Sequence, residues 1–466
     1  MTIKTIFPMT RIHEPMKVDV DIQNGKVANA WIGATLFRGF EAMMKGRDPR
    51  DAALFTQRIC GICSTAHAVT AAMALQQAYG IEPPPNGKHL INLIFAADMI
   101  QNHLRHFYIL AFFDYVKGPD MAPYMPRLKG DYRLPQKINE QLMAHYKESI
   151  LMAARAHEML AIFGAKVPMA QTIMTTGVTE RASSEKIVAY AAILKEISNW
   201  VNNVYLSDVM TLADYYKDYY HIGVGYGNMI SFGLFPQPIT GTYEFTPGLI
   251  VNRGLVSKLD LSKVGEESRY SWYRDEQQSR SPMEGQTIPD RDKEDAYSWV
   301  KAPRYGGQCF EGGPLARGWI NGDYRRGVSV MDRIVARALE TQKLCRLAEE
   351  WLQQLTPDGP TIQPFTPPQD GDGAGLTDAM RGPLGHWISI RQGKLQHYQI
   401  VTPTTWNFSP RDAHGIRGPV EEALIGTPVA NPDSLIEVGR VIRSYDPCFT
   451  CAVHLLDAPE DKLVLI

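Results

Sequence analysis

RICGICSTAH at residues 58–67 and DPCFTCAVH at residues 446–454 are the two stretches that decide how this chain folds. Each stretch carries two cysteines three positions apart, Cys60 with Cys63 and Cys448 with Cys451. This spacing lets both thiolates of a pair converge on one metal ion. In structural zinc sites two such pairs usually lie ~15–20 residues apart, whereas here nearly the whole chain separates them. A site that joins both pairs would close the fold end to end and lie deep inside it.

Thiolates are soft ligands, and four of them suit zinc, copper(I), nickel or iron–sulfur chemistry. Gly61 allows close approach of the backbone, and a helix that begins after Cys63 would favour the thiolate form. His67, one helical turn further on, can donate a hydrogen bond to a sulfur. Either pair alone is compatible with a zinc knuckle or a redox disulfide. Together the residues predict a buried site of four thiolates, without naming the metal.

Outward from these motifs, the sequence predicts a mainly helical protein with peripheral β-structure. Asn24 and Gly25 form the turn of a hairpin over residues 17–32, and Gln392 and Gly393 that of a second hairpin within 386–401. Long apolar patterns predict a buried helix bundle, with helices near 35–45, 65–79, 88–116, 135–163, 183–218, 327–356 and 432–444. Residues 219–325 read as irregular structure with short strands, and 359–375 as an exposed loop. We expect one large α+β domain around a long-helix bundle.

The composition is that of an ordinary globular protein. The 466 residues include 48 Lys and Arg against 50 Asp and Glu, with 44% hydrophobic residues. This balance argues against a nucleic-acid partner. No apolar run approaches the ~20 residues of a membrane span, and the densest, 90–100, is interrupted by Asn92 and Asp98. Residues 1–15 lack the apolar segment of a signal peptide, which fits a cytoplasmic enzyme or one exported with a partner.

In these two motifs, and over essentially its whole length, the sequence resembles the large subunit of nickel–iron hydrogenases. Further shared stretches are Arg38–Glu41, Gly46–Ala52, Gly313–Arg317, Arg381–Trp387 and Pro403–Asn407. The resemblance implies a catalytic domain over 1–454, with a helical core at 35–218 and 327–356 and a site-closing segment at 376–454. Residues 455–466 would then be a C-terminal extension that is removed during maturation.

The resemblance also implies the metal centre and its reaction. Nickel would be held by Cys60, Cys63, Cys448 and Cys451, with Cys63 and Cys451 bridging to an iron that carries CO and two cyanide ligands. Such a centre splits H2 heterolytically into a hydride and a proton, and a terminal thiolate can accept the proton.

Other residues match family positions around the centre. Arg381 would overhang the metals, oriented by Asp114 and Asp446, while Pro403 and Thr404 would surround the cyanides. A structural magnesium, which prefers oxygen ligands and retains water, would take Glu41, His454 and the carbonyl of Ile400. Without the resemblance, a loop arginine, a helix glutamate and a strand threonine would each be read as ordinary structural residues.

Three departures from the family pattern affect these expectations. His13 stands where the family usually has a glutamate that takes protons from the terminal cysteine. We therefore expect His13, or Glu14 after a one-residue slip in the alignment, to be the first proton relay. The alternative is that His13 has a purely structural role. Histidine titrates near neutrality and is suited to this role. Met380 stands where a proline is usual, and the chain is shorter than many relatives.

The remaining cysteines, Cys309 and Cys345, are expected to be free and buried. They cannot supply the four thiolates of an iron–sulfur cluster, so electrons must leave through another chain, and the resemblance implies an iron–sulfur small subunit. A maturation endopeptidase cutting after His454 and metal-insertion chaperones are further implied partners. The alternatives are a non-catalytic subunit of respiratory-complex type, which would lack the cysteine quartet, and a zinc-stapled scaffold.

Overall fold

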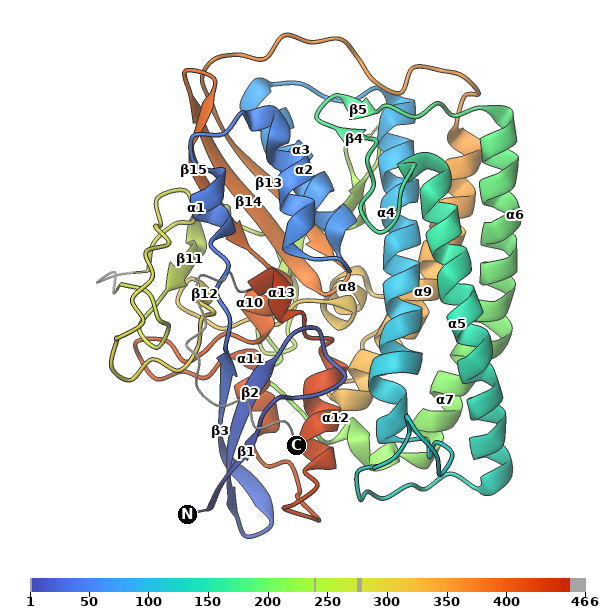
Figure 1. Cartoon of the computed structure of the whole chain (residues 1–466), viewed down its shortest axis with the longest axis vertical. Coiled ribbons are helices and arrows are strands. Elements are labelled where there is room, and N and C mark those ends of the chain that lie inside the picture. The colour runs from blue at the N-terminus through green and yellow to red at the C-terminus, as the bar shows by residue number, and fades with distance from the viewer. Residues whose placement is uncertain (1, 239, 275–278, 453–466) are drawn as a thin grey trace.

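A computed structural model describes residues 2–238, 240–274 and 279–452 of the chain. A bundle of long helices lies on one side of the molecule and a sheet with a covering helix on the other (Figure 1). The bundle consists of α4 (Pro85–Arg105), α5 (Gln136–Gly164), α6 (Ser184–Trp200), α7 (Leu206–Tyr215) and α9 (Val330–Gln354). Two π-helical segments, His106–Ala111 and Val201–Tyr205, continue α4 and join α6 to α7. This architecture confirms the predicted α+β class.

The central sheet is antiparallel, in the order β13 (Gly371–Ala379), β14 (Gly382–Arg391), β15 (Lys394–Val401). Helix α3 (Ser64–Tyr79) packs on β13. A Cβ atom built on Gly375 would lie 1.9 Å from the carbonyl oxygen of Thr70, and one on Gly373 would lie 2.2 Å from that of Ala74. Glycine at every second strand position therefore allows the backbones of helix and strand to touch. The expectation of an exposed loop over 359–375 was wrong for its last five residues, because their glycines line a packed strand face.

The two predicted hairpin turns are present. Asn24 and Gly25 both have positive φ angles, as do Gln392 and Gly393. The first turn joins β2 (Met16–Gln23) to β3 (Lys26–Ala34), with β1 (Thr2–Ile6) beside β2. The second joins β14 to β15.

Short elements make up the middle region and the surroundings of the cysteine motifs. Helix α1 (Phe40–Met44) is shorter than the expected helix at 35–45, and α2 (Ala52–Thr56) precedes the first motif. The middle of the chain holds β4 (Ile173–Met174), β5 (Gly177–Val178), β6 (Met229–Ser231), β7 (Leu234–Pro236), β8 (Tyr243–Phe245), β9 (Gly248–Ile250), β10 (Val256–Ser257), β11 (Val264–Glu267), β12 (Ala302–Tyr305) and α8 (Pro314–Asn321).

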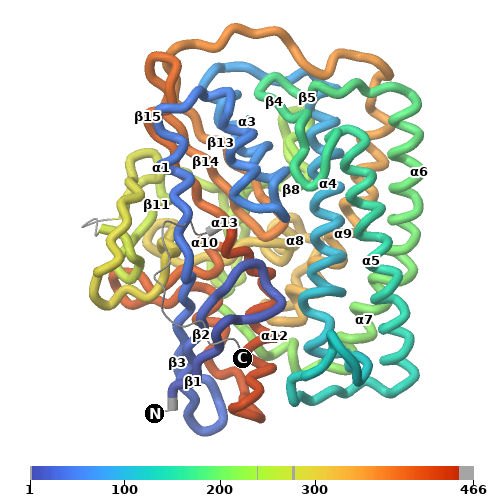
Figure 2. Tube along the Cα trace, in the orientation of Figure 1, coloured from blue at the N-terminus to red at the C-terminus, as the bar shows by residue number. Residues whose placement is uncertain are grey.

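The C-terminal segment runs back into the centre of the molecule. It contains α10 (Pro403–Asn407), α11 (Pro419–Leu424), α12 (Ile436–Ser444) and α13 (Phe449–Ala452). The trace in Figure 2 shows α13, in red, lying next to the blue N-terminal segments and the end of α3. The first and last parts of the sequence therefore meet in the interior, as a site built from both cysteine motifs requires.

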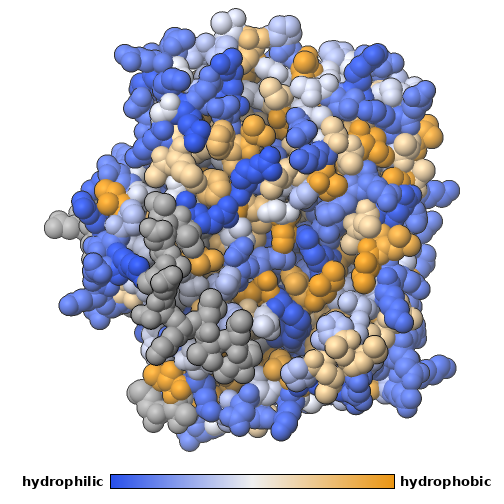
Figure 3. Space-filling view, in the orientation of Figure 1, coloured by the Kyte–Doolittle hydropathy of each residue, from blue (hydrophilic) through white to orange (hydrophobic). Residues whose placement is uncertain are grey.

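The surface shows no single dominant patch on the face of Figure 3, where apolar residues reach solvent in small areas between hydrophilic ones. Among the described helices, none combines the length and apolarity needed to cross a membrane.

Candidate metal centre

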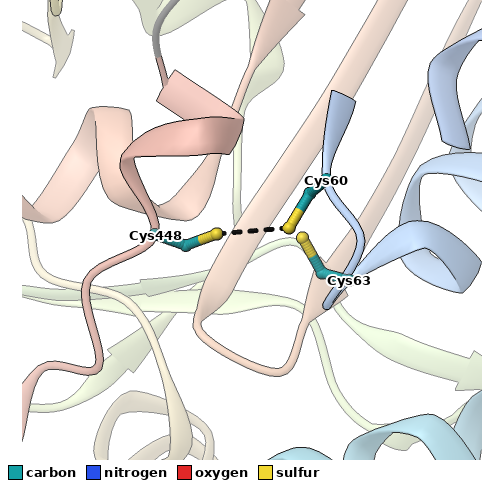
Figure 4. A group of neighbouring side chains, drawn as sticks. All are labelled: Cys60, Cys63 and Cys448. Atoms are coloured by element: carbon teal, nitrogen blue, oxygen red, sulfur yellow. Dashed lines mark hydrogen bonds between the residues drawn. The ribbon is translucent and has the colours of Figure 1, made fainter. Parts of the chain in front are cut away.

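Three cysteines from the two ends of the chain meet in the interior. The sulfur atoms of Cys60, Cys63 and Cys448 all lie within 4.8 Å of one another, and each residue is buried. The sulfurs of Cys60 and Cys448 are 3.3 Å apart (Figure 4). Cys451 lies in α13, three positions after Cys448, and its side chain is outside what the structure describes. The predicted convergence of both motifs is therefore observed for three of the four cysteines.

Local backbone structure explains how the thiols are presented. Cys63 is the N-cap residue of α3, where the positive end of the helix dipole favours a thiolate. The backbone N–H of Ile62 donates to the sulfur of Cys60 at 3.3 Å. Both contacts favour the deprotonated sulfur that a metal requires.

The N-terminal segment is tied to the second motif by backbone hydrogen bonds. The N–H of His13 donates to the carbonyl of Pro447 at 3.3 Å, and the N–H of Phe449 donates to the carbonyl of His13 at 2.9 Å. This pairing fixes Cys448 between its two neighbours. His13 therefore belongs to the wall of the centre.

Arg381 occupies the two-residue turn between β13 and β14, and it is buried beside the thiols. Its Nε donates to the backbone carbonyl of Asp446 at 2.7 Å, and its Nη2 donates to the carboxylate of Asp446 at 3.1 Å and to Oδ1 of Asn102 at 2.7 Å. Asp446 has a φ of 56°, and its backbone carbonyl oxygen and its carboxylate both accept from the guanidinium of Arg381. The Nη1 atom of Arg381 makes no hydrogen bond with the described part of the chain.

The charges of this group are mutually stabilised. Burial alone would disfavour the guanidinium of Arg381, but Asp446 and the thiols of Cys448, Cys63 and Cys60 raise its pKa. Conversely, although burial disfavours the carboxylate, Arg381 holds the pKa of Asp446 far below its ordinary value. A permanent positive charge therefore faces the sulfur atoms.

The structure does not bring Asp114 to Arg381. The buried carboxylate of Asp114 accepts hydrogen bonds from Nε and Nη2 of Arg443, at 2.6 and 2.7 Å, and it is also paired with Arg11. These two arginines keep its pKa below the ordinary value despite burial. Arg11 also donates to the carbonyl of Leu110 at 2.8 Å. The carboxylate thus anchors the N-terminal segment to α12, and it orients Arg381 at most indirectly.

The two candidate relay residues differ in position. His13 is half-buried, and its Nε2 atom is shielded from solvent and makes no hydrogen bond with the described residues. Burial, and next the charge of Arg381, lower the pKa of His13 to about 4. Glu14 is exposed on the outer side of the same turn. Of the two, His13 is the residue at the centre.

His67 belongs to a chain of buried hydrogen bonds that leads away from the cysteines. Its Nδ1 lies 3.1 Å from Nε2 of His386, whose Nδ1 lies 2.8 Å from the hydroxyl of Tyr398. Burial lowers the pKa of His67 to about 4, so the imidazole is neutral. Through this chain, the sheet fixes the orientation of the His67 ring in the first turns of α3.

Comparison with known proteins gives a consistent result. A family model described as nickel-dependent hydrogenase matches residues 38–128, 119–327 and 320–454. The chain belongs to the nickel-dependent hydrogenase family. It is 38% identical to the large subunit of the periplasmic [NiFeSe] hydrogenase of Desulfomicrobium baculatum, over 97% of this chain and 95% of the relative. The large chain of hydrogenase-2 from Escherichia coli (strain K12) is 30% identical over 99% of both chains.

A solved structure agrees with the sequence comparison. The [NiFeSe] hydrogenase of D. vulgaris Hildenborough in the reduced state superimposes with a TM-score of 0.94 at 39% identity, covering 97% of this chain and 100% of that chain. Although the names of this relative and of the D. baculatum relative include selenium, the present sequence has cysteine at all four motif positions. The buried soft thiols fit the nickel on which this family depends.

Four further predicted residues of this hydrogenase-family chain are buried: Glu41, Ile400, Pro403 and Thr404. The hydroxyl of Thr404 accepts a hydrogen bond from the N–H of Cys448 at 3.1 Å, and the neighbouring Pro403 starts α10. Glu41 accepts from the N–H of Ile400 at 2.9 Å and from the hydroxyl of Thr287. The third predicted magnesium ligand, His454, and the predicted extension 455–466 lie outside the described residues.

Sequence reasoning missed several polar residues of helix α4. Asn102 binds both Arg381 and Asp446, with its Nδ2 donating to the Asp446 carboxylate at 2.9 Å. Asp98 is buried on the same helix. The available signal was a polar residue recurring inside an otherwise apolar helix, which was noted at Asp98 only as an argument against a membrane span.

Cys309 and Cys345 are buried and form no disulfide among the described residues. Burial raises the pKa of each thiol to about 12. Both therefore remain protonated and act as small apolar side chains.

Proposed function

We propose that this chain is the catalytic subunit of a nickel–iron hydrogenase that oxidises H2 and, in reverse, reduces protons. The main observation behind the proposal is that three buried thiols from opposite ends of the chain meet near Arg381, a buried arginine whose Nη1 has no hydrogen-bond partner among the described residues. A zinc staple would need the thiols but not this arginine.

The metal set is the one that the family resemblance implies for the four cysteines. Cys60 and Cys448 would be terminal nickel ligands, and Cys63 and Cys451 would bridge to an iron carrying CO and two cyanide ligands. When bound, this group supplies the redox chemistry of H2 cleavage. Because the Thr404 oxygen already accepts the N–H of Cys448, its own hydrogen is left to donate to a cyanide, beside Pro403.

The chain's own residues would handle the charge and the proton. Arg381 stays charged throughout, so its role is to polarise H2 and orient it near the sulfurs, with Asp446 fixing its position. His67 holds its neutral ring by the sheet-anchored hydrogen bonds described above. His13, whose shielded Nε2 has no hydrogen-bond partner among the described residues, would be the first group to take a proton from a terminal cysteine, and Glu14 is the alternative first relay.

Glu41 would also bind a structural magnesium together with the carbonyl of Ile400 and the side chain of His454. Support comes from the placement of the Glu41 carboxylate at the backbone of Ile400. A carboxylate and a carbonyl are the oxygen ligands that magnesium prefers.

Electrons would pass to an iron–sulfur small subunit, since the two cysteines outside the motifs are far too few for a cluster. Maturation would need metal-insertion chaperones and an endopeptidase that removes residues 455–466. The domain would then be 1–454. The scaffold and respiratory-complex alternatives predict no nickel.

The decisive experiment measures nickel and iron in this chain after purification from the native host with its partner. We expect one nickel and one iron per chain, together with H2-dependent dye reduction. The variant Cys448→Ser, which replaces a soft ligand by a hard one, should lose nickel and all activity. Cys345→Ser is the matched control and should retain both. Zinc without nickel in an active preparation of the partner complex would contradict the proposal.

A further inference from the structure

One face of helix α4 is polar although the helix is buried. Asp98, Gln101, Asn102 and Arg105 follow one another at spacings of three, one and three, so they share a face. Asn102 marks where this face lies, because it binds Arg381 and Asp446 at the cysteine centre. The polar stripe of α4 is therefore part of the wall of the centre.

Apart from Asn102, the stripe has unpaired polar atoms. Both carboxylate oxygens of Asp98, Oε1 of Gln101, and Nε and Nη2 of Arg105 are shielded from solvent and make no hydrogen bond of ordinary geometry with the described residues. The hydroxyl of Thr65, on the facing helix α3, also lacks a hydrogen bond of ordinary geometry among the described residues, although it lies close enough to Asp98 to act on that carboxylate as a hydrogen-bond donor. Unpaired buried polar groups cost about 1–3 kcal/mol each, and proteins normally satisfy them with ordered water.

We propose that Asp98, Gln101, Arg105 and Thr65 bind a cluster of ordered water that conducts protons between the cysteine centre and the protein surface. This inference rests on the proposed function and adds a route to it. The route differs from the one through His13, because it runs along α4 rather than along the N-terminal segment.

The inner end of the stripe is at the centre. The charges of Cys60 and Arg381 both influence the carboxylate of Asp98. The outer end leads to the neighbouring helix α5. There the charge of Arg105 acts on His157, and burial followed by this charge lowers the pKa of His157 to about 4. His157 is half-buried, so the stripe leads to a side chain that reaches solvent at this point.

Asp98 is suited to exchange protons near neutrality. Burial raises the pKa of Asp98 to about 7, and the Cys60 thiol adds to the rise. The positive charges of Arg105 on α4 and Arg381 in the β13–β14 turn, and hydrogen bonding by Thr65 on α3, act in the opposite direction. In the transfer, water carries a proton released at the centre to the Asp98 carboxylate, where an O–H bond forms, and this bond breaks again when the proton moves on. No electron moves along this route. The proton then leaves through water, past Arg105 and His157, to bulk solvent.

The test uses the holoenzyme with its small subunit and the variant Asp98→Asn. General acid–base groups contribute about 10²–10⁴-fold to rate, so we expect H2 oxidation to fall about a hundredfold with unchanged nickel content. The solvent deuterium isotope effect should rise, and Asp98→Glu should recover part of the rate. Asp208→Asn is the matched control, because Asp208 is a buried acid of raised pKa that is fully engaged by Tyr108 and His145.

A second measurement does not depend on turnover. The infrared spectrum of the wild-type holoenzyme should contain a carboxylic acid C=O band that shifts in D2O, disappears with a midpoint near pH 7 and is absent in Asp98→Asn. Full rate with an unchanged isotope effect in Asp98→Asn, or persistence of the band in that variant, overturns the inference. So does a full loss of rate in His13→Ala with none in Asp98→Asn. A wild type without nickel or H2 turnover would instead refute the proposed function.

Discussion

Arg317 and Arg381 are both buried arginines near the turn that follows β13, yet their surroundings differ. Arg317 uses all three nitrogens: Nε and Nη2 donate to Glu340 at 2.7 Å, Nη1 donates to Asp378 at 3.0 Å, and the carbonyls of Ala379 and Met380 accept further hydrogen bonds. Arg381 binds Asp446 and Asn102, but its Nη1 makes no hydrogen bond within the described part of the chain. Every nitrogen of the Arg317 guanidinium therefore donates a hydrogen bond, whereas Arg381 has a nitrogen that donates none to the described residues.

This difference distinguishes an arginine that stabilises the structure, Arg317, from one that is available for the reaction, Arg381. Saturating a buried charge makes a rigid anchor, whereas an unpaired donor beside ligands is costly unless something binds there. Arg317 grips the backbone directly before Arg381, so the saturated residue positions the unsaturated one. In the family the residue before the arginine at position 381 is usually proline. This chain has Met380 there, and Arg317 donates a hydrogen bond to the Met380 carbonyl.

Removal of the saturated arginine should have the largest effect. In Arg317→Met the carboxylates of Glu340 and Asp378 lose their shared cation in the interior. Breaking a buried ion pair on one side costs about 3–5 kcal/mol. We expect a large fall in the unfolding temperature of the full chain and low nickel incorporation, measured by calorimetry and metal analysis.

The control for this prediction replaces the charges together. Arg317→Met combined with Glu340→Gln and Asp378→Asn should recover part of the lost stability, because no uncompensated charge remains buried. An unfolding temperature unchanged in the single variant would show that Arg317 is not the anchor that its hydrogen bonds indicate.

Arg381→Lys should leave stability nearly intact and affect the reaction. Lysine keeps the positive charge beside the thiols, but a single ammonium group cannot both hold Asp446 and present a second nitrogen to the centre. We expect H2 oxidation to fall about a hundredfold, equivalent to roughly 3 kcal/mol, with nickel content unchanged. Metal analysis alongside dye-reduction kinetics checks this; full activity in Arg381→Lys would remove the distinction between the two arginines.

The sequence was sufficient for the general architecture and for the main elements of the site. Hairpin turns at Asn24–Gly25 and Gln392–Gly393 follow from local backbone preferences, and the long helices follow from apolar periodicity. The strand β13 was missed because its alternating glycines carry no apolar pattern, and their purpose is visible only once α3 lies against them.

The contacts of the site depended on tertiary structure in the same way. The cysteine motifs and Arg381 were found because their spacing or resemblance identifies them. Asp114 was assigned to Arg381, but it binds Arg11 and Arg443, and no local pattern tells which of several buried arginines a carboxylate will meet. Asn102 was overlooked because an amide inside a helix is ordinary in sequence and acquires its role only from the two charged partners.

The smallest expected effect comes from comparing two buried acids: Asp98 on the polar stripe of α4, and Glu340, which is paired with Arg317. Burial raises the pKa of Asp98 to about 7, whereas Arg317, against the effect of burial, keeps that of Glu340 at about 2. An acid whose native pKa is raised binds its proton more tightly when folded. Its contribution to stability is complete below the unfolded pKa and is lost as pH rises through 7. The pKa of Glu340 is lowered instead, so its contribution to stability is present above the unfolded pKa and is lost only as the pH falls into the acid range.

Stability should therefore depend on pH through Asp98 but not through Glu340 in the neutral range. Between about pH 6 and pH 8 the nickel-free full chain should lose about 1 kcal/mol more than Asp98→Asn does, since one proton changes stability by at most ~1.4 kcal/mol per pH unit. Glu340→Gln should be less stable at every pH but keep the wild-type slope. Denaturant unfolding at three pH values measures both. If wild type and Asp98→Asn showed the same dependence of stability on pH, Asp98 would be ionised over this whole pH range, as Glu340 is. The polar stripe of α4 would then hold a fixed charge rather than an exchangeable proton.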